Sequence, residues 1–177
     1  AALAWLGSNA PRLGIDPARI ALGGDSAGGN IAAALAQQMA DRGDTAARLQ
    51  VLVYPATNLR DPHPSREENA EGYLLTAESI AWFDAQIGTR HASVDDARLS
   101  PALRPDLSAL PRALVLSGGY DPIRDDGLAY AARLRQAGVP VQLLHYAGQF
   151  HGFLNFDAVL HAARDALDRI GDALAQA

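Results

Sequence analysis

A serine set among small residues is the first feature of this sequence that could do chemistry. Gly24-Asp25-Ser26-Ala27-Gly28-Gly29 follows the apolar run Ile20–Leu22 and precedes an alanine-rich segment of helical character. A strand that enters a helix through so tight a turn pushes the serine hydroxyl out of the sheet and points the helix N-terminus at the reacting carbonyl. Glycines two positions before and after the serine leave room for that turn. Ser26 is therefore a candidate nucleophile, and the alternative is a serine that only caps a helix beginning near Asn30.

A carboxylate and an imidazole follow two later strands. Asp121 comes just after the third predicted strand, and His151 lies in a glycine-flanked loop beyond the fourth. Each has an ordinary explanation, Asp121 as a turn-forming residue and His151 as a hydrogen-bonded loop residue. However, the order Ser, Asp, His after successive strands is that of the α/β-hydrolase triad. We therefore predict Ser26 as nucleophile, Asp121 as acid and His151 as base, while Asp125 and Asp126 fit capping and dipole roles at the next helix.

The composition excludes other chemistries. The 177 residues contain no cysteine, and all fifteen basic residues are arginine, so thiolate nucleophiles, thiolate metal sites and Schiff-base lysines are ruled out. A net charge of −5 without basic clusters argues against nucleic acid and anionic membrane partners. We expect a cytoplasmic protein without cofactor, metal or membrane span. The other four histidines show no metal-ligand spacing: His63, His91, His145 and His161.

Short apolar runs alternate with amphipathic segments, which predicts an α/β fold with a parallel sheet and crossover helices. The predicted strands are Ile20–Gly23, Leu49–Tyr54, Ala113–Gly118 and Val141–Tyr146. The apolar faces of three helices are predicted from helical spacing. They comprise Ile31, Leu35 and Met39; Leu128, Ala131 and Leu134; and Val159, Ala163, Ala166, Ile170 and Leu174.

Residues 58–100 separate two strands by more than one helix requires. This segment contains a proline-rich loop at Asp61–Pro64 and a predicted helix at Thr76–Ile87. Insertions of this size at the carboxyl edge of a sheet commonly cover a site, so we expect a lid here. Trp82 and Phe83 on its helix are candidates for an acyl-pocket wall or for simple packing.

Three segments together resemble the hormone-sensitive-lipase-like branch of the α/β-hydrolases, bacterial carboxylesterases in particular. They are Gly23–Asn30, Tyr120–Gly127 and His151–Phe153, and the similarity runs along essentially the whole chain. The resemblance implies a serine carboxylesterase that cleaves short to medium acyl esters through an acyl-enzyme. It also implies that the Ala27 amide donates to the oxyanion.

The chain departs from this family in one respect. The sequence contains no His-Gly-Gly-Gly motif, which in the family supplies the other oxyanion donors, and only about twenty residues precede the first strand. We therefore expect residues 1–177 to form the C-terminal portion of one hydrolase domain, with a partial α/β-hydrolase fold and weak activity alone. An N-terminal half or a homo-oligomer would cover the first strand, which would otherwise be an exposed edge. Two alternatives remain, a non-catalytic ligand-binding relative and a hydrolase of amides or thioesters.

Overall fold

The described residues form one sheet of four parallel strands in chain order, β1-β2-β3-β4. The computed structural model describes residues 2–60, 63–87 and 93–177. The strands are β1 (Ile20–Asp25), β2 (Ala47–Val53), β3 (Arg112–Tyr120) and β4 (Val141–Phe150). All four predicted strands and their parallel arrangement are confirmed, and β3 and β4 run further toward the carboxyl edge than predicted. Nearly all of β2 and β3 is buried on both faces, which explains their continuous apolar sequences.

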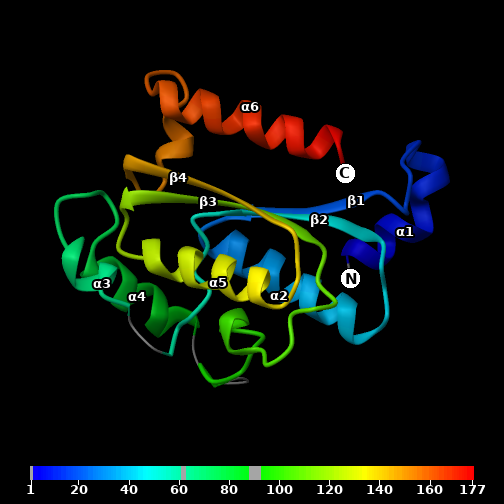
Figure 1. Ribbon diagram of the computed structural model, residues 1–177, viewed down its shortest axis with the longest axis horizontal. Helices are drawn as coiled ribbons and strands as arrows, with labels where there is room; N and C mark the ends of the chain where they lie inside the picture. The colour runs from blue at the N-terminus through cyan, green and yellow to red at the C-terminus, as the bar shows by residue number, and fades with distance from the viewer. Residues whose placement is uncertain (1, 61–62, 88–92) are drawn as a thin grey trace.

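Helices cover both faces of the sheet (Figure 1). Helices α2 (Ala27–Asp41) and α5 (Arg124–Gln136) lie on one face, and α6 (His161–Ala175) lies on the other. Helix α1 (Ala2–Leu13) precedes β1. The α2/α5 side packs around Leu52, Val115 and Leu134, whereas the α6 side packs around Leu114, Leu116, Ala163 and Ala166. No helix in the described ranges is long and apolar enough to cross a membrane.

The predicted helix faces need three corrections. Ile31 is 66% exposed, because it lies on the side of α2 that faces a pocket rather than the sheet. Val159 is 74% exposed, since α6 begins only at His161. Leu174 is also exposed, whereas Ala163 and Ala166 are buried as predicted.

In the described part of the segment between β2 and β3 lie the helices α3 (Ser65–Glu68) and α4 (Ala77–Ile87) and the 3-10 turn η1 (Pro101–Leu103). The helix predicted from Thr76 is confirmed as α4, with the Thr76 hydroxyl accepting a hydrogen bond from the Ser79 amide at 3.1 Å. No residue of α4 is buried. Asp61, Pro62 and His91, named in the sequence predictions, lie outside the described residues.

Candidate active site

The turn from β1 into α2 holds Ser26 in a strained backbone conformation, with φ +52° and ψ −117°. Such a strained turn persists only where the surrounding backbone holds it in place. Here the neighbouring backbone segments approach so closely that two positions have room only for glycine. A Cβ on Gly24 would overlap the backbone of Gly28, and one on Gly29 would lie 2.8 Å from the Pro55 Cβ. A Cβ on Gly28 would meet only an Asp25 oxygen at 3.8 Å. The space predicted around Ser26 therefore depends on Gly24 and Gly29, and Gly28 could accommodate a methyl group.

Ser26, His151 and Asp121 form a continuous chain of hydrogen bonds. The Ser26 Oγ lies 2.9 Å from His151 Nε2, and His151 Nδ1 lies 2.8 Å from Asp121 Oδ2. Ser26 makes no side-chain capping bond to α2, so the alternative role as a helix cap is wrong. The turn-forming alternative for Asp121 holds as well, because its Oδ1 accepts the Ile123 amide at 2.8 Å. One buried carboxylate thus shapes its own turn and contacts the imidazole.

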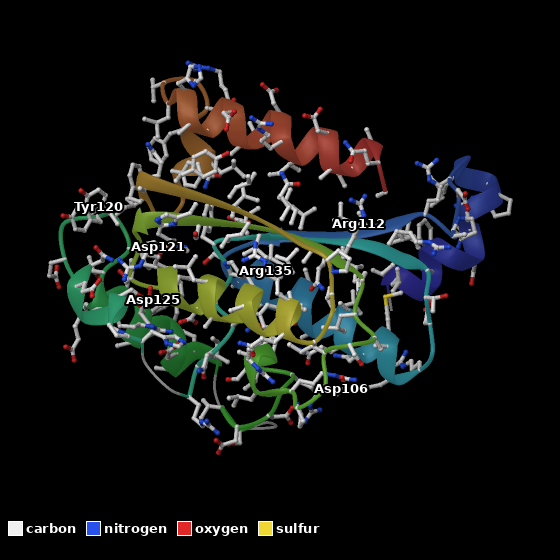
Figure 2. The ribbon with its side chains drawn as sticks, in the orientation of Figure 1. Asp106, Arg112, Tyr120, Asp121, Asp125 and Arg135 are labelled. Carbon is white, nitrogen blue, oxygen red and sulfur yellow. The ribbon has the colours of Figure 1, made fainter. Side chains whose placement is uncertain are left out.

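Two glycines near the end of β3 allow His151 to come close to Asp121. The β3–β4 register shifts between Gly118 and Tyr120. A Cβ on Gly119 would overlap the Ala147 carbonyl, and one on Gly118 would lie 2.8 Å from the Gln149 carbonyl oxygen. Figure 2 shows Asp121 beside Tyr120 at this end of β3, with Arg112 at the opposite end. Sequence reasoning did not assign this role, although two adjacent glycines inside an apolar strand are a signal of close backbone approach.

A pocket of about 600 Å³ opens above the serine. Ser26, Ala27 and His151 line it together with residues of the β2–β3 segment. Its walls are mostly apolar and include Ile31, Leu75, Ile80, Phe83, Ile87 and Leu99. Of the two aromatic candidates on α4, Phe83 lines the pocket, whereas Trp82 is 60% exposed and contacts Phe83 edge to face. The site can therefore hold an apolar group next to a polarised hydroxyl.

Polar side chains tie the β2–β3 segment to the rest of the fold. The Asn30 amide donates to the Ala56 carbonyl at 2.6 Å and to the Leu99 carbonyl at 2.7 Å, which joins both ends of the segment to α2. Asp126, in the first turn of α5, is fully buried and accepts the Thr57 and Asn58 amides.

Burial raises the Asp126 pKa to about 6, although the positive charge of Arg66 and the hydrogen bonds from the Asn58 and Thr57 amides oppose this shift. Asp125 and Asp126 both lie in the first turn of α5, as the predicted dipole role requires, but the predicted capping role is wrong, because the N-cap residue is Ile123, whose side chain makes no capping bond. Asp125 instead accepts the Ser65 amide and pairs with Arg124. Neither carboxylate takes the place of Asp121 at His151. The contacts of Asp126 with the β2–β3 segment could not be predicted, because nothing local in the sequence indicates the burial of this side chain.

A second serine–histidine pair lies within the sheet. The Ser117 hydroxyl on β3 is 2.9 Å from Nδ1 of His145, its register partner on β4. Ser117 is buried, and neither residue lines the pocket. The Ser117–His145 pair can therefore be compared with the Ser26–His151 pair within the same protein.

Known proteins resemble this chain closely. The profile of the alpha/beta hydrolase fold family matches residues 1–155. The ethyl acetate hydrolase of Pseudomonas putida is 42% identical over 97% of this chain and 54% of its own length. Carboxylesterase NlhH of Mycobacterium tuberculosis is 42% identical over 96% of this chain and 54% of its own length. The chain spans about half the length of the curated relatives it matches.

A solved structure shares the fold. The hyperthermophilic esterase of the archaeon Pyrobaculum calidifontis superposes with a TM-score of 0.93 at 41% identity, covering 98% of this chain and 57% of that one. The resemblance inferred from three sequence segments is thereby confirmed across nearly the whole chain.

Proposed function

The chain belongs to the alpha/beta hydrolase fold family, and from this premise we propose that it carries the catalytic residues of a serine carboxylesterase. The observation that supports this most strongly is the hydrogen-bonded series Ser26–His151–Asp121 at the base of an apolar pocket. Such a pocket suits the acyl or alcohol group of a short to medium acyl ester. The names of the relatives, ethyl acetate hydrolase and carboxylesterase, favour the same substrate class.

In the proposed reaction the Ser26 Oγ attacks the ester carbonyl carbon while its proton passes to His151 Nε2. The tetrahedral intermediate collapses, the C–O bond to the alcohol breaks, and the alcohol leaves with the proton from His151. Water then attacks the acyl-serine and gives a proton to His151. The second tetrahedral intermediate collapses as His151 returns this proton to the Ser26 Oγ, which releases the carboxylic acid and restores the Ser26 hydroxyl. Throughout, Asp121 holds the Nδ1–H tautomer and stabilises the transient imidazolium.

Two further assignments complete the proposal. The Ala27 amide is at the first position of α2, where it has no acceptor within the helix, and it borders the pocket beside Ser26. We assign it as an oxyanion donor. We also assign residues 58–100 as a lid within the hydrolase domain, because Phe83 and Ile87 from this segment line the same pocket as Ser26.

Hydrolysis of p-nitrophenyl acetate and butyrate tests the proposal. Ser26→Ala should lower kcat by about 10⁴-fold or more, because the nucleophile is lost. Ser117→Ala is the matched control and should leave kcat nearly unchanged. Turnover should also decline at acidic pH as His151 takes up a proton. Undiminished turnover in Ser26→Ala would place the nucleophile elsewhere, and ester binding without turnover would favour a non-catalytic relative.

A further inference from the structure

Tyr54, immediately after β2, has a backbone conformation that is unusual for its residue type. Its φ is +36°, although tyrosine carries a Cβ, and its side chain is only 1% exposed. The Tyr54 amide donates to the Leu116 carbonyl at 2.8 Å, so the strained residue is held to β3. Strain of this kind persists only where the surroundings enforce it, and it is concentrated at functional sites.

The strained backbone places the Tyr54 ring against His151. The two ring centroids are 4.7 Å apart, with an interplanar angle of 58°. Phe153 supports the tyrosine from another side at 5.9 Å, and Tyr146 in turn contacts Phe153 at 5.1 Å. The imidazole is therefore supported by a buried aromatic cluster as well as by its two hydrogen bonds.

The tyrosine hydroxyl does not explain the placement of the residue. It is buried near the Leu154 backbone, yet in the described part of the chain it forms no hydrogen bond of good geometry. A buried hydroxyl without a partner costs free energy. The ring, rather than the hydroxyl, is the part of the side chain that makes a favourable contact.

We propose that Tyr54 is a positioning residue for His151, a role that rests on the proposed function of the site. The imidazole reorients by rotation about χ1 and χ2 of His151, which would break its bonds to Ser26 and Asp121. The Tyr54 ring packs against the imidazole and limits that rotation, so Nε2 stays directed at the Ser26 hydroxyl. A misplacement of about 1 Å in a catalytic group typically lowers turnover by about 10²-fold.

Three substitutions distinguish the effect of the Tyr54 ring from the effect of its hydroxyl and from a general loss of stability. Tyr54→Met removes the ring but keeps much of the volume, and Tyr54→Phe removes only the hydroxyl. Tyr130→Met is the matched control, since Tyr130 is fully buried on α5 at the opposite face of the sheet. We expect Tyr54→Met to lower kcat by about 10- to 100-fold with KM little changed, and the other two to retain kcat within about threefold.

An NMR measurement of the His151 Nδ1 proton supplies a second readout that does not depend on turnover. The resonance should be sharp in the wild type, in Tyr54→Phe and in Tyr130→Met, and broadened or lost in Tyr54→Met. If Tyr54→Met does not fold, Tyr54→Leu takes its place. A sharp, unshifted resonance in a variant without the ring would overturn the proposal, as would Tyr54→Phe behaving like Tyr54→Met. If Ser26→Ala stayed active, the proposed function would fail while this resonance still tested the Tyr54 contact.

Discussion

The two serine–histidine pairs of this chain have the same oxygen-to-nitrogen distance, 2.9 Å, in very different surroundings. Ser26 is on a strained turn, lines the pocket, and has a histidine whose second nitrogen contacts Asp121. Ser117 is buried within β3, and the described residues include no carboxylate bonded to His145. A short Ser–His distance is therefore common to both pairs and cannot by itself identify a nucleophile. Strain, a carboxylate and access to a pocket distinguish the pair that we propose to be reactive from the pair within the sheet.

We expect the largest effect on stability and activity from a substitution that prevents β4 from coming close to β3. Gly119→Ala would drive its Cβ into the Ala147 carbonyl, and because that carbonyl belongs to the backbone, it cannot move aside cheaply. We expect the free energy of unfolding to decrease by about 3 kcal/mol or more and ester hydrolysis to be lost. Gly148→Ala on β4 is the control, because its Cβ would meet nothing within 4 Å. Urea unfolding and a turnover assay measure both effects, and equal behaviour of the two variants would contradict the role assigned to Gly119.

Asp121→Asn would make the Ser26 pair resemble the Ser117 pair by removing its carboxylate. The asparagine carbonyl can still accept the Ile123 amide, so the turn and the melting temperature should be nearly retained. Its NH₂ group would favour the wrong imidazole tautomer, and kcat should decrease by about 10⁴-fold. Asp125→Asn serves as the control, since Asp125 bonds Ser65 and Arg124 instead. A larger loss of kcat in Asp125→Asn would mean that the acid is misassigned.

Asp126→Asn tests how the buried carboxylate that accepts the Thr57 and Asn58 amides affects stability at different pH values. The Asp126 pKa of about 6 in the folded state exceeds the usual value near 3.9 for an unfolded chain. The folded state thus binds more protons between about pH 4 and 6, and this carboxyl makes stability decline as pH rises through that window. The substitution should remove about 2–3 kcal/mol of that decline, as measured by urea unfolding at pH 4 and pH 7. An unchanged difference between the two pH values would show that Asp126 does not titrate as described.

We expect the smallest effect, on substrate preference, from a change in the apolar lining of the pocket beside Ser26 and His151. Phe83→Ala should enlarge the pocket and alter the ratio of kcat/KM for butyrate over acetate esters by several-fold, about 1 kcal/mol or less. Trp82→Ala, one residue away on α4 but outside the pocket lining, should leave that ratio unchanged. Equal shifts in the two variants would show that α4 acts as a whole rather than through Phe83.

The sequence was sufficient to predict the parallel sheet and the three side chains that meet at Ser26, because strand sequences and the elbow motif are local patterns. It was not sufficient for contacts that depend on packing between distant segments. The close approach of Gly119 to β4, the burial of Asp126 and the contact between Tyr54 and His151 are of this kind. Ile31 shows the same limit, because its helical spacing predicted a core residue whereas the fold directs it to the pocket.

Covalent labelling with a short-alkyl fluorophosphonate, followed by peptide mapping, tests most directly whether only one of the two pairs is activated. The reagent requires an activated serine hydroxyl but no deacylation, so it reports on the nucleophile itself. We predict one adduct, on Ser26, formed much more slowly in Asp121→Asn and at the wild-type rate in Ser117→Ala. An adduct on Ser117 or another hydroxyl, or labelling of Ser26 that does not depend on Asp121, would contradict the account.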